Sequence, residues 1–295
     1  MAKIGFHIVR LWVAFLSIHP YWLLYLKSDC YFFLVYYILR YRRKVVRQNL
    51  LNSFPDKDEK EIKRIERCFY QNLCDLFVEA PKMLRIKANG YQSRITYTNV
   101  ELVQNLYEQG KNVFYAIPHS GNWEWFGKMT GELTQHKCLA VYKRVKSPVF
   151  ERLMLYIRTC HSSLEMVESN SALRRLAQLR DGTNAVLMMA DQTSYGLASD
   201  YWTEFLHQDT CWFTGIERIA RKLDYAVVFV DMRRKGRGRY EVTFELVTDT
   251  PKETKEGEIM ERYVRCVERF IEASPDNWLW SGRRWKHQRP QTVEA

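Results

Sequence analysis

Residues 112–127 read NVFYAIPHSGNWEWFG, and this stretch decides the fold class. Residues 113–117 form a short apolar run rich in strand-favouring side chains, so we expect a buried strand there. Pro118 ends that strand, and Asn122 is suited to cap a helix over residues 123–133. His119 therefore lies where a strand ends and a helix begins, which is where open α/β sheets place their chemistry.

The chain beyond this stretch alternates strand-like and helix-like segments. Further strands are expected at residues 138–142, 164–167, 185–190, 225–231 and 240–247. Helices are expected at residues 58–79, 148–160, 171–180, 214–223 and 258–273. This alternation favours an α/β fold with a mainly parallel, mixed sheet flanked by helices. The last two strands are expected to form an antiparallel hairpin. We expect its basic loop, residues 233–239, either to bind a membrane or another protein, or to be a solvated turn.

The first 50 residues combine apolar runs with positive charge. The runs 11–26 and 30–39 are each shorter than the roughly 20 apolar residues that a spanning helix needs. We expect them to form one imperfect span or, preferably, two helices lying in a membrane interface, with an ordinary buried helix pair as the alternative. Eight Lys or Arg against one Asp give this segment +7 (8 − 1) of the chain's formal +11. The pairing favours an anionic membrane surface over nucleic acid.

The positive charge of this segment is densest at residues 40–47. We expect that cluster either to contact lipid phosphates on the cytoplasmic side or to be solvated. The chain is accordingly divided into a membrane-anchoring segment, residues 1–50, and a second domain, residues 51–295.

Several familiar kinds of site are excluded by pattern. The seven cysteines are scattered and never spaced C-x-x-C, so neither a disulfide framework nor a thiolate zinc site is indicated. The sequence contains no G-x-S-x-G and no H-E-x-x-H. Residues 121–128 resemble a phosphate loop superficially, but they carry one residue too many, and Met129 stands where Ser or Thr is needed. Acid–base chemistry without a metal or bound cofactor remains.

His119 and Glu124 suit that chemistry. An imidazole titrates near neutral pH and can take a proton from a hydroxyl, while a carboxylate within reach can fix its tautomer. Backbone N–H groups at the helix start, near Gly121 and Asn122, can support a developing oxyanion. Judged by spacing alone, however, a histidine after a strand is more often structural.

Four blocks of the chain, in the order in which a known family carries them, favour a catalytic role for His119. Residues 118–124, Pro-His-Ser-Gly-Asn-Trp-Glu, resemble the H-x-x-x-x-D/E motif of glycerolipid acyltransferases, and specifically its form in the bacterial lipid A late acyltransferases. Residues 142–144, Tyr-Lys-Arg, and residues 190–192, Ala-Asp-Gln, with Phe205 and residues 214–215 downstream, resemble that family's second and third blocks. Residues 278–286, Trp-Leu-Trp-Ser-Gly-Arg-Arg-Trp-Lys, resemble its C-terminal block, although Gly282 replaces a frequent His.

This resemblance implies transfer of a fatty acyl chain from an acyl carrier protein or coenzyme A thioester to a hydroxyl of a lipid, at the cytoplasmic face of the inner membrane. His119 would be the general base and Glu124 its orienting partner. Phosphate or carrier contacts are expected from Arg144, Asp191, Arg283 and Arg284. The acceptor is expected to be a lipid A precursor, with a lyso-aminolipid or a lysophospholipid as alternatives. A basic membrane-surface scaffold or a nucleic-acid binder is the non-enzyme interpretation.

Overall fold

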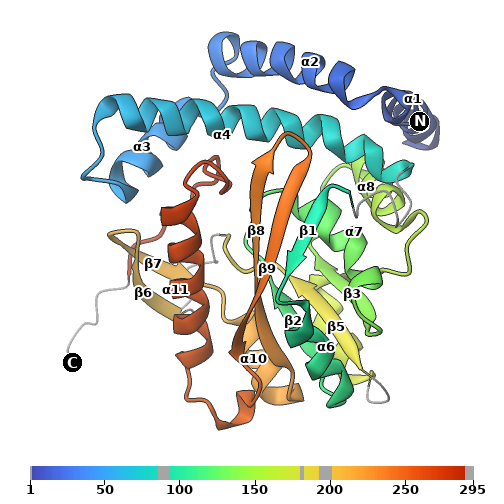
Figure 1. The fold of residues 1–295 in the computed structure, drawn as a ribbon, viewed down its shortest axis with the longest axis vertical. Helices are drawn as coiled ribbons and strands as arrows, with labels where there is room; N and C mark the ends of the chain where they lie inside the picture. The colour runs from blue at the N-terminus through green and yellow to red at the C-terminus, as the bar shows by residue number, and fades with distance from the viewer. Residues whose placement is uncertain (1, 86–92, 180–182, 193–200, 290–295) are drawn as a thin grey trace.

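The computed structural model describes residues 2–85, 93–179, 183–192 and 201–289. Its centre is a seven-stranded sheet in the order β1-β9-β8-β2-β5-β3-β4 (Figure 1). The strands are β1 Ile95–Thr98, β2 Val113–Ala116, β3 Lys137–Tyr142, β4 Glu165–Glu168, β5 Asn184–Met188, β8 Ala226–Gly236 and β9 Arg239–Thr248. Every neighbouring pair is parallel except the β8–β9 hairpin. The predicted α/β class, mainly parallel mixed sheet and hairpin are confirmed.

Helices cover both faces of the sheet, and successive side chains of a strand point alternately to one face and the other. Val113 and Tyr115 of β2 pack with α6 Val100–Glu108, α7 Trp123–Leu133 and α8 Pro148–Thr159. Phe114 and Ala116 point the other way, toward α9 Ala172–Ala177, α10 Gly215–Leu223 and α11 Glu258–Ala273. A small antiparallel sheet, β6 Tyr201–Phe205 and β7 Gln208–Trp212, packs on the second face. The sheet is therefore buried between two helical layers.

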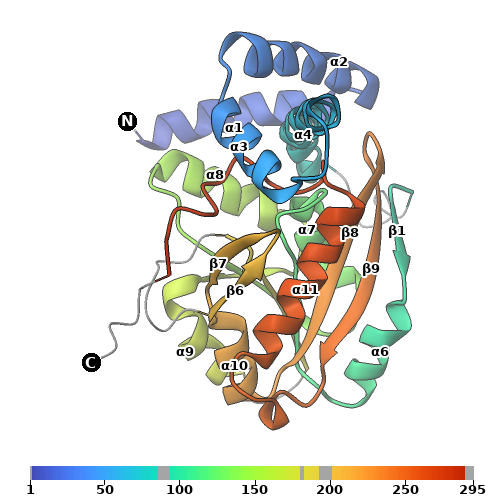
Figure 2. The same cartoon turned by 90° about the vertical axis from the view of Figure 1, so that its left-hand side faces the viewer.

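A third helical layer crosses one edge of the sheet. It contains α1 Ala2–Ile18, α2 Tyr21–Phe32, the π-helix η1 Phe33–Ile38, α3 Arg43–Ser53 and α4 Glu59–Glu79, followed by the 3₁₀ turn η2 Ala80–Leu84. Figures 1 and 2 agree that α4 lies between α2 and the sheet, beside the tip of the β8–β9 hairpin. β8 runs parallel to β2, so this tip marks the edge where the parallel strands end.

The N-terminal helices are interrupted at Pro20, whose missing N–H and fixed φ disfavour a continuous helix. Among the described residues, no single helix is long and apolar enough to cross a membrane. The pair Gly5–Ile18 and Tyr21–Ile38 passes that test jointly, by length and composition, with a bend of 119° between its halves. Ten large apolar side chains of this pair and its immediate C-terminal neighbour are more than half exposed: Ile8, Leu11, Trp12, Phe15, Ile18, Trp22, Leu26, Phe33, Ile38 and Leu39.

The basic clusters of the sequence are partly used inside the protein. Arg43 and Arg47 both pair with Glu66 of α4, whose side chain is only 1% exposed. The expectation of either lipid contact or a solvated run therefore does not describe these two arginines. A domain boundary at residue 50 would fall inside α3.

Candidate active site

The register of two adjacent strands brings His119 and Asp191 together. Ala116 at the end of β2 is paired with Met188 at the end of β5. His119 and Asp191 each lie three residues beyond that pair (116 + 3 and 188 + 3). Because both strands are parallel and neighbours, their continuations meet at the same edge of the sheet.

Asp191 binds His119 through both of its oxygens. Oδ1 lies 2.7 Å from His119 Nδ1, and Oδ2 accepts a hydrogen bond of 2.8 Å from the His119 backbone N–H. Oδ2 also accepts a hydrogen bond of 2.8 Å from Nε1 of Trp278. The Asp191 side chain is 2% exposed, so water does not compete for it. This geometry favours the tautomer with the proton on Nδ1, and His119 Nε2 then accepts from the Gln192 amide at 3.0 Å.

The charges around the imidazole raise its affinity for a proton. Burial by itself lowers the pKa of His119, but the charge and hydrogen bond of Asp191, with a further contribution from Glu124, raise that pKa above its usual range. Burial acts to raise the pKa of Asp191, yet the neighbouring His119 and the bonds from His119 and Trp278 hold it below its usual range. Asp191 therefore stays ionised while His119 titrates.

Glu124, the partner expected from spacing, binds a different residue. Its carboxylate forms a two-pronged ion pair with Arg158 of α8, at 2.8 Å from Nε and 2.6 Å from Nη2. Burial lowers the pKa of Arg158, but the hydrogen bonds and charge of Glu124 more than offset this, so Arg158 keeps its charge. The structure thus gives His119 a hydrogen bond to Asp191, where the sequence analysis expected one to Glu124. Glu124 interacts with the imidazole electrostatically.

The turn between β2 and α7 is tightly constrained. Gly121 has a φ of +54°, and a Cβ there would lie 2.8 Å from the carbonyl oxygen of Met232 in β8, so only glycine fits. Asn122 accepts a hydrogen bond of 3.0 Å from the Trp125 N–H, which confirms it as the N-cap of α7. The Gly121 N–H donates to Asn277 O at 3.3 Å. Both residues shape the turn, and their support of an oxyanion stays a prediction.

The C-terminal block lies directly against this turn. Leu279 donates its N–H to the carbonyl oxygen of His119 at 3.1 Å, and Ser120 forms an isolated antiparallel bridge with Trp278. The ring of Trp123 packs edge-on against the imidazole, with ring centroids 5.2 Å apart. The first and last predicted blocks, far apart in sequence, therefore form one structure around His119.

Among the described residues, two cavities of several hundred Å³ meet at His119. The first, which we call the β3–β5 cavity, has a volume of about 310 Å³ and lies between the ends of strands β3 to β5 and helices α7 and α8. The second, the C-terminal cavity, has a volume of about 390 Å³ and is lined by Arg42, Trp278, Ser281 and Arg284 among others. His119 and Gln192 line both. A proton acceptor at this junction can act on a molecule in one cavity while a second molecule occupies the other.

The predicted cationic contacts lie in different surroundings. Arg284 is 3% exposed, borders the C-terminal cavity, donates to Cys211 O at 2.7 Å and stacks over Trp212, and burial lowers its pKa to about 10. Arg283 is exposed. Arg144 is largely exposed and pairs with Glu168 at 3.1 Å. Arg284 is thus the best placed of the three to meet an anion in a cavity.

Sequence reasoning missed Arg158 and Gln192 as site residues and gave Asp191 a different role. The available signal for Asp191 was its position at the end of a predicted apolar strand, 185–190. Gln192 follows it directly. Arg158 lies on α8, which follows strand β3, and nothing in the spacing of the sequence connects it with Glu124.

The description that fits this arrangement is an acid–base site at the carboxyl edge of an α/β sheet, open to two cavities. The family model of the bacterial lipid A biosynthesis acyltransferases matches residues 3–287. The chain belongs to that family and is an acyltransferase. A search of curated proteins found no match.

Proposed function

We propose that the protein transfers a fatty acyl chain from a thioester, carried by acyl carrier protein or coenzyme A, to a hydroxyl of a lipid A precursor, with His119 as general base. The observation that carries this proposal is the hydrogen bond between His119 Nδ1 and the buried Asp191. It directs the unprotonated Nε2 to the junction of the two cavities.

In this reaction His119 Nε2 takes the proton of the acceptor hydroxyl as its oxygen attacks the thioester carbonyl carbon. A C–O bond forms, the C–S bond breaks, and the imidazolium returns the proton to the departing thiolate. The hydroxyl replaces the Gln192 amide as the partner of Nε2. A positioned base of this kind contributes about 10²–10⁴-fold to the rate.

The roles of the two carboxylates differ. Asp191 holds the imidazole in the required tautomer and orientation, as a hydrogen-bonded partner. Glu124 stabilises the imidazolium through space, while its two-pronged ion pair with Arg158 holds the carboxylate in place.

The β3–β5 cavity suits the hydrocarbon chain of the donor, because Leu164, Met166, Leu187 and Met189 line it. The C-terminal cavity suits a phosphorylated acceptor, because guanidinium groups of Arg42 and Arg284 border it. Arg144 and Arg283 lie on the surface, where they suit an acidic carrier protein or the lipid headgroups better than a buried phosphate.

The exposed apolar face of α1, α2 and η1 supports attachment to the cytoplasmic surface of the inner membrane. An apolar surface of this extent is unusual on a soluble monomer and marks a site of membrane or protein contact. The bend of 119° suits a helix pair lying in the interface. A lipid acceptor would then reach the site without leaving the membrane surface.

The proposal is tested by mass spectrometry of lipid A and aminolipids from cells that lack the gene and are complemented with wild type, His119→Ala or, as a control, His161→Asn. We expect a secondary acyl chain to be missing from lipid A and restored by wild type and by the exposed control, but not by His119→Ala. An unchanged lipid A with a missing diacyl aminolipid or phospholipid would reject the lipid A acceptor and retain the mechanism.

A further inference from the structure

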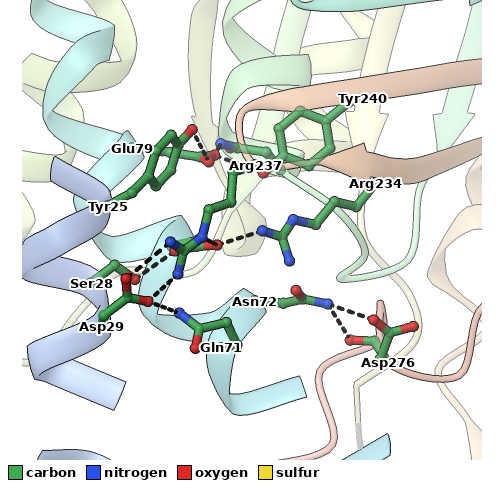
Figure 3. A network of polar contacts seen from close by, with 12 residues as sticks. Tyr25, Ser28, Asp29, Gln71, Asn72, Glu79, Arg234, Arg237, Tyr240 and Asp276 are labelled. Carbon is green, nitrogen blue, oxygen red and sulfur yellow. Dashed lines mark hydrogen bonds and ion pairs between the residues drawn. The ribbon is translucent and has the colours of Figure 1, made fainter. Parts of the chain in front are cut away.

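Glu79, the last residue of α4, is a buried carboxylate outside the proposed chemistry. Its side chain is fully buried and accepts three hydrogen bonds from three different segments. Oε2 accepts from the Asn122 amide and from the Tyr240 hydroxyl, each at 2.7 Å. Oε1 accepts from the Tyr25 hydroxyl at 3.0 Å. Figure 3 shows Tyr25 of α2 and Tyr240 of β9 converging on this carboxylate.

The bond to Asn122 connects Glu79 with the turn that carries His119. Asn122 lies three residues after His119 and is fully buried, and its amide is used at both ends. Its nitrogen donates to Glu79, while its oxygen caps α7 at Trp125. The indole Nε1 of Trp125 also donates to the backbone oxygen of Glu79, at 3.3 Å. The C-terminus of α4 therefore holds the first turn of α7 at two points.

A carboxylate is a costly way to join these segments. Burial raises the pKa of Glu79, although the bonds from Tyr240, Asn122 and Tyr25 act in the opposite direction. Well-packed apolar side chains often stabilise a fold as well as buried charge does. What a carboxylate adds is two strong acceptor atoms, one of which fixes Asn122 and Tyr240 together.

We propose that Glu79 is a positioning residue for acyl transfer: it fixes the His119–Asn122 turn and, through Tyr25, holds the N-terminal helix α2 in register with that turn. The inference rests on the proposed role of His119. It assigns α2 a second task besides membrane attachment, since the helix shares with the catalytic turn a single buried carboxylate.

A neighbouring carboxylate supplies the control. Asp75, one helical turn before Glu79, accepts from Ser28 of α2 at 2.6 Å and pairs with Arg234 and Arg237 of the hairpin. Ser28 and Tyr25 thus each join α2 to α4 by one hydrogen bond from a side-chain hydroxyl. Only the bond of Tyr25 leads to the carboxylate that holds Asn122.

The test compares Glu79→Leu, Glu79→Gln, Tyr25→Phe and Ser28→Ala in the full chain, by steady-state acyl transfer in mixed micelles and by hydrogen exchange of residues 119–126. Glu79→Leu is expected to lower kcat by about 10–100-fold, because a shift of roughly 1 Å at a reacting group costs up to about 10²-fold. KM is expected to change less than twofold or so, since Glu79 lies behind the turn and away from both cavities. Exchange in residues 119–126 is expected to accelerate.

The other variants grade the effect. Glu79→Gln can still accept from Asn122 and Tyr240 through its oxygen and donate to Tyr25, so a kcat loss of at most about fivefold is expected. Tyr25→Phe is expected to lower kcat and loosen residues 119–126, whereas Ser28→Ala is expected to change neither. Should Glu79→Leu fail to fold, the double variant Tyr25→Phe/Tyr240→Phe takes its place.

A wild-type kcat in Glu79→Leu or in the replacing double variant would overturn the inference. So would hydrogen exchange that rises uniformly over the chain, since that pattern indicates a loss of stability alone. Equal effects of Tyr25→Phe and Ser28→Ala would overturn the assignment of α2 to the turn. If wild type transfers no acyl group, the proposed function fails instead, and the exchange of residues 119–126 still decides whether Glu79 holds the turn.

Discussion

Replacing Asp191 by asparagine reverses one hydrogen bond while keeping two others. The side-chain oxygen of the new asparagine would take the place of Oδ2, which accepts at 2.8 Å from both the His119 N–H and the Trp278 indole. The amide nitrogen would then face His119 Nδ1, where Oδ1 now lies at 2.7 Å. Because that nitrogen is a donor, Nδ1 must become an acceptor, and the imidazole proton moves to Nε2.

The expected result is a folded protein with a misplaced proton. An Nε2 that carries a proton cannot take one from an acceptor hydroxyl, so most of the contribution of a general base, about 10²–10⁴-fold, is lost. At about 1.36 kcal/mol per tenfold, the barrier rises by roughly 3–5 kcal/mol. The loss of the Asp191 charge also lowers the pKa of His119. Activity requires neutral imidazole and fades as pH falls through this pKa, so the acidic limb of the residual kcat/KM profile moves to lower pH.

The assay is the pH dependence of acyl transfer by wild type and Asp191→Asn, with Asp231→Asn as a matched control. Asp231→Asn also changes a carboxylate to an amide on a strand of the sheet, but Asp231 lies in the middle of β8 and pairs with Arg233 instead of a histidine. Thermal unfolding of all three proteins verifies the fold. An Asp191→Asn enzyme with activity within a few-fold of wild type, or with an unmoved acidic limb, would refute the assignment of Asp191 as the partner of His119.

Three further outcomes are expected. Glu124→Gln removes the ion-pair partner of Arg158 and one negative charge near the imidazole, so kcat falls by about 10²-fold and the acidic limb of the pH profile moves to lower pH. Leu187→Trp fills part of the β3–β5 cavity, so competition between acyl donors shifts toward shorter chains. The double variant Leu11→Glu/Trp22→Glu lowers the affinity for lipid vesicles, measured by sedimentation, at least about 100-fold and leaves the circular dichroism spectrum unchanged. The reason is that each of these exposed apolar side chains contributes about 1.5–3 kcal/mol when it enters the membrane.

The strongest local signals predicted the parts of the fold that surround the site. An apolar run, a proline and a capping asparagine predicted β2 and α7, and the helices at 123–133 and 258–273 have the predicted bounds. The predicted helix 171–180 is shorter in the structure, Ala172–Ala177, and residue 180 lies outside the described ranges. These agreements share a cause, since each element carries its own start signal or a long apolar periodicity.

The missed elements lack such signals. β1 has four residues and takes its place at the sheet edge only by pairing in parallel with β9, which follows it by more than a hundred residues. The helix α6 has nine residues, and its N-cap Asn99 adopts a left-handed conformation without a side-chain capping bond. Short elements that depend on distant partners are stabilised by tertiary contacts, which local patterns do not report.

The partner of His119 was missed for the same reason. The spacing of five residues to Glu124 is visible in the sequence, whereas Asp191 is 72 residues away. Predicted strands at 113–117 and 185–190 place His119 and Asp191 at two carboxyl ends. That these strands are neighbours, with Ala116 opposite Met188, is a property of the sheet order, which hydrophobic patterning does not determine.

The distribution of charge explains why the motif carries a glutamate that does not touch the histidine. The ionised groups that act most strongly on His119 are Asp191, Glu124 and Arg158. With a neutral imidazole their charges sum to −1 (−1 − 1 + 1), and with an imidazolium the sum is zero. In the proposed mechanism the site is therefore electrically balanced in the state that forms as the hydroxyl loses its proton, and catalysis requires stronger stabilisation of that state than of the ground state. Without Glu124, Arg158 and Asp191 would already cancel, and a proton on His119 would add an uncompensated buried charge.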